Sequence, residues 1–351
     1  MATNPGRRAE WLVDVLTAEF GESMAVDPAA FRRKFRKMAA SPFAFYRGSA
    51  SVFYADLVED FADDRFLDGR TSRVWIHGDL HAENFGTYMN GSGQLVFNVN
   101  DFDEAYVGPF SWDLKRFAAS VALLGYGKAL SDDAIGDLVT RFATAYLTEL
   151  RAIAAGGDDA IGSIRLDNAD GVLRRVLQQA RLRTRVDLLA QQTTVDQYER
   201  RFSLGEGVYE VDRDVRDAVL TAFEHYLDTL PPVNAEHRPV TMQIKDVVLR
   251  KGVGIGSAGL PSYNLLLEGH TQALENDVVI YMKRAQVPAV ARHVTDEGYA
   301  ATSGTRDTGR PSRSGRCRHT PIRGWASPSW TGTASSSPRS PRTPPTWTGR
   351  T

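Results

Sequence analysis

The hydrophobic pattern changes its period near residue 240, and this change restricts the chain to folds that combine helices with a separate sheet. Before that point apolar residues recur at helical spacing, most clearly over 131–154, where an apolar stripe follows a Ser131 cap. After it come three β-rich runs, TMQIKDVVLRKG, LPSYNLLLEG and DVVIYMKRA. The sequence therefore predicts an α+β chain with a helix-rich domain at 1–235 and a β-rich domain at 236–300. Further helices are expected over 28–39, 112–126, 170–192 and 212–229.

The composition limits the cellular locations and the cysteine chemistry that the chain can have. The chain has 351 residues, of which 42% are hydrophobic and 24% charged, and no apolar run approaches the roughly 20 residues of a membrane span. The N-terminal sequence MATNPGRRAEWLVDVL does not resemble a secretory signal, so we expect a cytoplasmic location and no membrane partner. The single cysteine, Cys317, excludes an intrachain disulfide and a cysteine-based zinc cage.

The segment 301–351 has a composition unlike the rest. It contains nine of the 42 Lys and Arg residues, all arginine, but one acid, Asp307, and it has no Leu, Val or Phe. A segment so poor in aliphatic residues cannot bury enough surface to offset its ordering entropy, so we predict a disordered tail. Its arginines could attract nucleic acid electrostatically, but it has no lysine and no fold signal, so a nucleic-acid partner is not expected.

The stretch HGDLHAENFG, residues 77–86, concentrates polar chemistry directly after the apolar run VWI. Short strands are expected at 73–76 and 94–100, on either side of it. His77, Asp79 and Asn84 have the spacing His-x-Asp-x-x-x-x-Asn of the catalytic loop in kinases and their small-molecule relatives. There a carboxylate orients the substrate hydroxyl, while an amide oxygen reaches a magnesium ion on the phosphates. We therefore predict Asp79 and His77 as catalytic residues and Asn84 as a metal ligand.

A second acidic motif, NDFDEA, follows Asn84 and places Asp101 at the end of the second expected strand. Phosphoryl transfer needs hard oxygen ligands for magnesium near the carboxylate that orients the nucleophile. Asp101 is predicted to be such a ligand. Asp103 could bind a second metal ion or simply face solvent.

Each of these residues also has a purely structural interpretation. Asp79 and Asn84 could form a capped turn, although their joint occurrence with Asp101 favours the catalytic reading. His77 is more readily explained as a hydrogen-bond partner that holds the loop than as a proton shuttle, and His81 as structural rather than a ligand. Asp113 is expected to brace the loop.

The motifs in this region are similar to those of the aminoglycoside phosphotransferase and choline kinase group. That group has HGD in the loop, and its metal motif is followed by a Gly-Pro turn and a helix that starts with Trp/Tyr-Asp-Leu. Here VGPFSWDLKRFA supplies these features in order, so the resemblance covers about residues 75–118. It implies a kinase-like fold and transfer of a phosphoryl group from ATP with Mg²⁺.

The part of such a fold that binds the nucleotide would lie late in this chain. Gly254, Gly256, Ser257 and Gly259 belong to a GxGxxG segment between two β-rich runs, whereas a Rossmann fingerprint requires a helix after the glycines. Lys283, two strands later, is where a kinase places the lysine that pairs with the α- and β-phosphates. The glycines could instead form an ordinary hairpin, and the lysine could be an edge charge. The order of parts predicts a two-lobed, protein-kinase-like fold in circularly permuted order, with the helical catalytic lobe first and the β-rich nucleotide lobe second.

This order also resembles a bacterial family known as domain-of-unknown-function family 2252. The segment SPFAFYRGSA, read as a loop with a turn at Arg47-Gly48, precedes HGDLHAENFG, and GVGIGSAG and a lysine strand follow, over roughly residues 30–298. The resemblance implies a kinase-like fold but does not identify a substrate. Two departures are Arg284, where Glu is expected in relatives, and the tail. Codon degeneracy lets Ser314–Ile322 read in a shifted frame as Gln-Arg-Ser-Met-Gln-Ala-His-Thr-Asp, which looks like the family's continuation, so we hypothesise that 301–351 is frameshifted.

These observations predict an ATP- and Mg²⁺-dependent phosphotransferase that acts on a hydroxyl group of a small molecule. Two alternatives stay open: a catalytically inactive, pseudokinase-like module that binds nucleotide, and nucleotidyl transfer from ATP. The sequence does not identify the acceptor molecule. The specificity of the protein for its acceptor is expected to come from the helical region 130–230.

Overall fold

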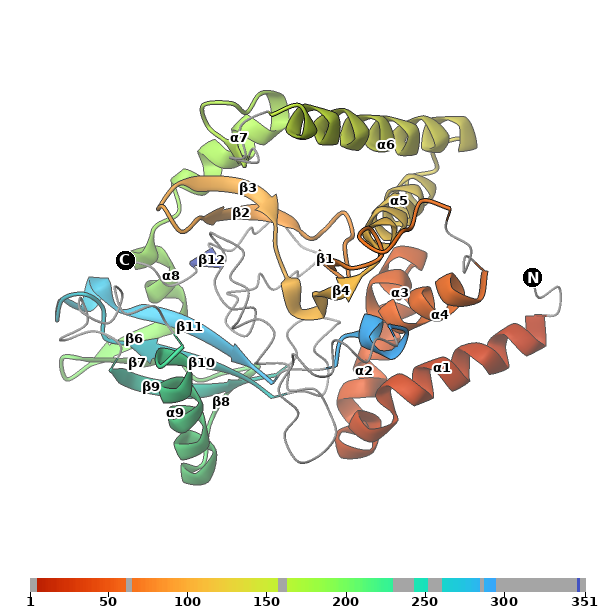
Figure 1. Cartoon of the computed structure of the whole chain (residues 1–351). Coiled ribbons are helices and arrows are strands. Elements are labelled where there is room, and N and C mark those ends of the chain that lie inside the picture. The colour runs from red at the N-terminus through yellow and green to blue at the C-terminus, as the bar shows by residue number, and fades with distance from the viewer. Residues whose placement is uncertain are drawn as a thin grey trace.

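Helices and strands are both abundant in the structure, a computed structural model, which confirms the α+β class (Figure 1). It describes residues 5–60, 65–156, 163–229, 243–251, 261–284, 287–294 and the two-residue strand β12 (Thr346–Trp347). The tail predicted at 301–351 lies outside the described residues, apart from β12, which pairs with β2 in parallel.

Four helices form the N-terminal region: α1 (Pro5–Val26), α2 (Pro28–Met38), α3 (Pro42–Gly48) and α4 (Ala50–Asp60). The prediction of a loop over SPFAFYRGSA is wrong, because α3 and the start of α4 occupy it. Ser41 accepts a hydrogen bond from the Ala44 amide at 3.1 Å, and Pro42 takes the first helical position. Both are helix-start signals that outweigh the turn propensity of Arg47-Gly48.

The central region consists of short strands and a single 3-10 turn. Strand β1 (Val74–Ile76) pairs with β4 (Tyr106–Gly108), and β2 (Phe85–Met89) pairs with β3 (Leu95–Val99), both antiparallel. The turn η1 (Phe102–Glu104) lies between β3 and β4. The expected strands at 73–76 and 94–100 are confirmed.

Two long helices follow, α5 (Phe110–Gly127) and α6 (Asp132–Ala154). The predicted helix over 131–154 is confirmed, and the Ser131 hydroxyl accepts from the Ala134 amide at 3.3 Å. The two helices pack through Phe117 and Phe142, whose ring centroids lie 4.5 Å apart. No residue of α6 is fully buried, and Figure 1 shows it running along the outside of the molecule.

A four-stranded antiparallel sheet forms the second half of the structure, in the order β11-β10-β9-β8. Because neighbouring side chains of a strand point to opposite faces, Leu265 and Leu267 pack against one set of elements and Leu266 against another. Helix α9 (Arg213–Leu227) covers the first face, and α8 (Arg185–Gln192) with strand β7 (Glu199–Phe202) covers the second. The strands are β8 (Val208–Glu210), β9 (Ile244–Arg250), β10 (Ser262–Leu267) and β11 (Val278–Lys283).

The segment between the two regions departs from the expected helices. The predicted helix over 170–192 is two helices, because Thr184 forms a capping box that starts the second one. A hairpin, residues 193–202, and β8 then follow between the two helices expected at 170–192 and 212–229, inside the domain expected to be helix-rich. The sheet thus takes β8 from one side of the predicted domain boundary at 235/236 and β9 to β11 from the other, and that boundary stays a prediction. The remaining elements are β5 (Ile164–Arg165), α7 (Gly171–Arg181), α8 (Arg185–Gln192), β6 (Thr193–Asp196), β7 (Glu199–Phe202), α9 (Arg213–Leu227), and the turns η2 (Leu274–Asn276) and η3 (Ala289–Arg292).

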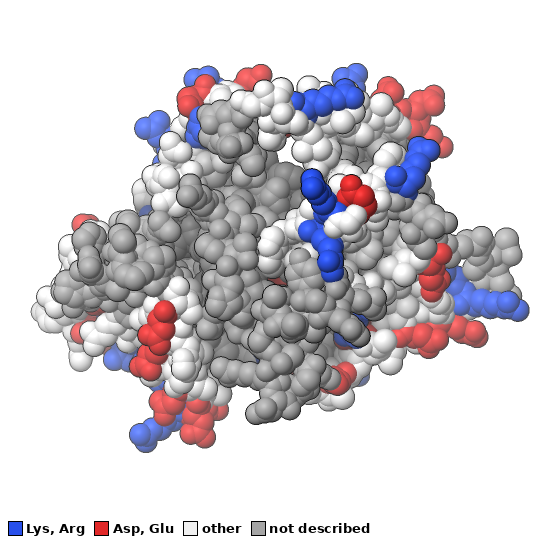
Figure 2. Space-filling model, in the orientation of Figure 1, with Lys and Arg blue, Asp and Glu red and all other residues white. Residues whose placement is uncertain are grey.

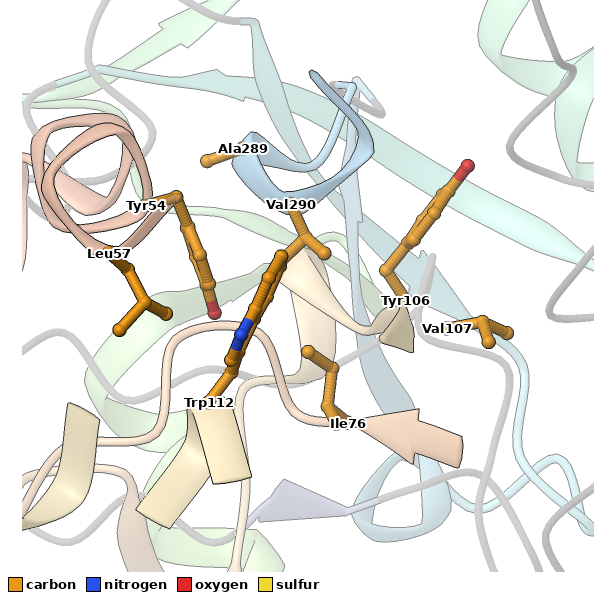
Figure 3. Close-up of a cluster of buried hydrophobic side chains, with 8 residues drawn as sticks. All are labelled: Tyr54, Leu57, Ile76, Tyr106, Val107, Trp112, Ala289 and Val290. Atoms are coloured by element: carbon orange, nitrogen blue, oxygen red, sulfur yellow. The ribbon is translucent and has the colours of Figure 1, made fainter. Parts of the chain in front are cut away.

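A hydrophobic core joins the late turn η3 to the early part of the chain. Figure 3 shows Val290 between the aromatic rings of Trp112 and Tyr106, with Tyr54 on the other side of Trp112. Val290 is completely buried. The core therefore fixes the chain just after β11 against α4, β1, β4 and α5.

Surface charge of both signs is mixed around the visible face of the described residues (Figure 2). Over the same residues, every helix is too short or too polar to cross a lipid bilayer.

Replacing Val290 by Ala should destabilise the protein by about 2 kcal/mol, because the change removes two buried methyl groups and leaves a cavity in this core. Val287→Ala is the matched control, since Val287 is 39% exposed and the same truncation should change the free energy of unfolding by less than about 0.5 kcal/mol. Urea unfolding measures both values. Equal losses would contradict the anchoring role of η3.

Candidate active site

Two loops, 77–84 and 100–105, form the candidate site, and the strand register forces them together. The first loop joins β1 to β2, and the second joins β3 to β4. Ile76 pairs with Tyr106 at one end, and Phe85 pairs with Val99 at the other. Both ends of the first loop therefore lie beside an end of the second. The spacing between Asn84 and Asp101 is the length of one β-hairpin.

His77 connects the two loops through its ring. Its Nε2 donates to the Asn100 carbonyl at 2.8 Å, and its Nδ1 accepts from the Asp79 amide at 3.2 Å. The Asn100 amide in turn donates to the Asn84 carbonyl at 2.9 Å. With both ring nitrogens bound to backbone groups, His77 holds the loops in register and has no free nitrogen for proton transfer.

Asp113 and Tyr54 hold the start of the first loop from outside. The Asp113 carboxylate accepts from the amides of His77 at 2.6 Å and Gly78 at 3.1 Å, and the Tyr54 hydroxyl donates to the Gly78 carbonyl at 2.6 Å. Burial raises the pKa of Asp113, and the two amide bonds oppose that shift. The sequence predicts this bracing role for Asp113.

Asp79 lies at the centre of the first loop and is paired with a cation that the sequence reading missed. Arg116 donates to its Oδ1 from Nε at 2.8 Å and from Nη2 at 2.5 Å. The Arg116 side chain is fully buried, whereas that of Asp79 is 20% exposed. Arg116 lies three residues after Asp113 on α5, so both face the same loop, and this spacing is the signal that could have found it.

Asn84 and His81 complete the first loop. The Asn84 Nδ2 donates to the Asp79 carbonyl at 2.7 Å, which leaves the amide oxygen as the group able to bind a cation. His81 accepts from the Glu83 amide at Nδ1, and its Nε2 lies 3.8 Å from Oδ2 of Asp79. Burial lowers the pKa of His81 to about 4, against the opposing charge of Asp79, so this ring is neutral near pH 7.

The second loop contributes the carboxylates of Asp101 and Asp103. Asp101 adopts a left-handed backbone conformation with φ of 61°, which is uncommon for a residue other than glycine. Burial raises its pKa to about 6, and the negative charge of Asp103 adds to the shift. A half-buried carboxylate beside another one is suited to accept a cation.

Lys283 supplies one such cation from the far end of the chain. Its Nζ lies 3.1 Å from Oδ2 of Asp103, across 180 residues of sequence. Burial alone would lower the pKa of Lys283, but the charges of Asp103 and Asp101 outweigh it, so the pKa is raised. The structure therefore brings Lys283 to the second loop.

The register of the sheet also places Arg250 and Ser262, the strand residues that precede and follow the glycine segment. Ser262 pairs with both Arg250 and Lys283, so β9 ends and β10 begins at the end of the sheet that carries Lys283. Gly254, Gly256, Ser257 and Gly259 themselves lie outside the described residues.

Further groups at the site have protein partners. Arg47 forms an ion pair with Glu83 of the first loop. Within the described ranges, no three His, Cys, Asp or Glu side chains come together as a metal cage. Asn84, Asp101 and Asp103 could hold magnesium only with water or phosphate oxygens completing the shell, which is the usual manner for this ion.

The fold and the site together define an α+β protein in which two adjoining loops, 77–84 and 100–105, carry a group of carboxylate and amide side chains. A family model described as "Uncharacterized protein conserved in bacteria (DUF2252)" matches residues 26–310, and the chain belongs to this family. Residues 311–351 lie outside the match. No curated protein and no solved structure matches the chain significantly.

Gly78→Ala should destabilise the protein strongly, because Gly78 has φ of 79° and an added Cβ would lie 2.0 Å from the Glu104 carbonyl oxygen. Gly93→Ala is the control, since Gly93 has φ of 73° but no atom within 4 Å of the added Cβ. We expect a loss of about 1 kcal/mol in the control and more than about 3 kcal/mol at Gly78, measured by urea unfolding. Similar losses would show that the two loops are not in close contact.

Asp101→Asn should stabilise the protein near pH 7. The pKa of Asp101 rises from 3.8 to about 6 on folding, so the folded protein favours the protonated carboxyl. As the pH rises through 6 the carboxyl ionises, and the folded state loses stability relative to the unfolded state. The variant should gain up to about 3 kcal/mol over the wild type between pH 4 and pH 7. Thermal unfolding across this range tests it, with exposed Asp137→Asn as the control. A variant less stable than the wild type at pH 7 would contradict the burial of this charge.

Proposed function

We propose that this chain is a phosphotransferase that uses ATP and Mg²⁺ to phosphorylate a hydroxyl group on a small molecule. The proposal includes a two-lobed, kinase-like arrangement in circularly permuted order. The helical region with the two loops acts as the catalytic lobe. The sheet of β8 to β11 acts as the nucleotide lobe.

The observation that carries the proposal is the ion pair between Lys283 and Asp103. Phosphoryl transfer needs a cation for the phosphates opposite the carboxylates that hold the metal, and it depends almost entirely on such positioning. Lys283 ends β11, at the same end of the sheet where the chain leaves β9 and enters β10. This end of the sheet faces Asp103 of the second loop.

The donor set fits the ions that the reaction requires. The amide oxygen of Asn84 accepts no hydrogen bond from the residues that the structure describes, and Asp101 is a half-buried carboxylate whose pKa is raised by desolvation and by its neighbour Asp103. A bound divalent cation would stabilise the charged form of Asp101 and, with phosphate oxygens, neutralise charge on the transferring group. Asp79 would orient the acceptor hydroxyl and take its proton, and Lys283 would pair with the phosphates.

One observation favours the pseudokinase alternative. Lys283 is engaged by Asp103 and has a raised pKa, so nucleotide binding must compete with an existing ion pair. A module in which this pair persists would respond to nucleotide without turnover.

Two Asp variants separate these functions. Wild-type protein should be stabilised by MgATP, by about 2.7 kcal/mol at 100 times the dissociation constant. Asp79→Asn should bind MgATP as the wild type does but lose ADP formation by about 10²-fold or more, because the change removes the proton acceptor and leaves Asn84, Asp101 and Lys283 unaltered. Asp101→Asn should lose the magnesium-dependent part of nucleotide binding and the turnover with it. Calorimetry and ADP release, with water as the acceptor, measure binding and turnover.

Asp137→Asn, on the exposed side of α6, should match the wild type in both measurements. Absence of any MgATP binding by the wild type would reject the nucleotide-dependent functions together. Binding without formation of ADP or pyrophosphate would reject the phosphotransferase and support the pseudokinase, whereas release of pyrophosphate would support nucleotidyl transfer.

A further inference from the structure

Arg116 is a buried cation whose geometry is unusual for a residue that only stabilises the fold. An arginine normally bridges a carboxylate with two donors to two oxygens. Here Nε and Nη2 both donate to the single oxygen Oδ1 of Asp79, at 2.8 and 2.5 Å. Its third nitrogen, Nη1, is buried and has no hydrogen-bond partner among the described residues. The guanidinium is therefore oriented toward one oxygen of Asp79, although another orientation could satisfy more of its hydrogen-bond donors.

Helices α3 and α4 fix the plane of this guanidinium. Its carbon lies 4.4 Å from the ring centroid of Tyr46 and 5.0 Å from that of Phe53. Nη2 also donates to the Tyr46 carbonyl at 3.1 Å, and the Tyr46 hydroxyl donates back to the Arg116 carbonyl at 2.8 Å. These contacts hold the guanidinium in the orientation that directs Nε and Nη2 to Oδ1 of Asp79.

The consequence lies at Oδ2 of Asp79. This oxygen receives nothing from Arg116, and its neighbour His81 is 3.8 Å away, beyond hydrogen-bond distance. The Asp79 side chain is partly exposed, while Arg116 beneath it is not. Oδ2 is thus left to meet an incoming hydroxyl group.

We propose that Arg116 is a positioning residue that holds Oδ1 of Asp79 and reserves Oδ2 as the oxygen that takes the acceptor's proton; this rests on the proposed function. In the transfer, the acceptor oxygen forms a bond to the γ-phosphorus. The bond from that phosphorus to the β,γ-bridging oxygen breaks, and ADP leaves with the electron pair. The acceptor proton moves to Oδ2. With water as the acceptor the products are ADP and inorganic phosphate.

Arg116→Lys tests the proposal, because lysine keeps the charge but has neither the planar pair of donors nor the stacked plane. ADP formation from MgATP in water should fall by about 10- to 100-fold, while MgATP affinity stays within about two-fold of the wild type. The control is Arg8→Lys, which alters an ordinary Arg–Asp pair in which two nitrogens donate to the two oxygens of Asp56, each at 2.6 Å, far along the chain from the two loops. It should change neither quantity.

A double-mutant cycle separates positioning from a structural role. In an Asp79→Asn background, Arg116→Lys should cause almost no further loss of turnover, since the group it positions is already disabled. Independent losses that multiply would overturn the proposal, as would wild-type turnover in Arg116→Lys. If Arg116→Lys does not fold, Arg116→Gln replaces it, because a neutral amide still donates to Oδ1. Failure of both variants to fold would assign Arg116 to stability alone and overturn the proposal.

The wild-type protein distinguishes this outcome from failure of the proposed function. Wild-type protein that neither binds nor hydrolyses MgATP would reject the function itself, and the positioning role with it. An active wild type with an equally active Arg116→Lys would reject the positioning role alone.

Discussion

Two antiparallel strand pairs, β1 with β4 and β2 with β3, determine the geometry on which the site depends. Each loop is held at both ends by strands that also hold the other loop. Hydrogen bonds then join Asn100, at the start of the second loop, to His77 and Asn84 at the two ends of the first. A change in register by one residue would turn the side chains of a strand to its other face, so the arrangement tolerates little sliding.

The carboxylates gathered by these loops are compensated unequally. Asp79 is paired with Arg116, and Asp103 with Lys283, but Asp101 is half-buried, with a raised pKa and a left-handed backbone conformation. Unfavourable conformation and unfavourable charge in one residue are typical of sites that gain stability from a ligand. The shared family and the mixed α+β fold are consistent with many chemistries, so the argument for phosphoryl transfer comes from these residues alone.

Local patterns predicted the parts of the structure that local forces decide. The helix after Ser131 and the strands on either side of the first loop follow from periodicity and capping. The loop prediction at Arg47-Gly48 failed because the helix-start signals of Ser41 and Pro42 were given too little weight. The partner of Lys283 could not be read from the sequence, because tertiary folding brings Asp103 to it across 180 residues. Arg116, 37 residues from Asp79, had only one sequence signal, its spacing of three from Asp113 on α5.

Ala289 and Val290 leave the ribosome long after the residues they cover. Synthesis proceeds from the N-terminus at about 5–20 residues per second, so α4, β1, β4 and α5 are complete well before η3 exists. Until then Tyr54, Ile76 and Trp112 lack part of their apolar surroundings. The nascent chain must keep this surface from aggregating, and a product released before residue 289 would expose it permanently.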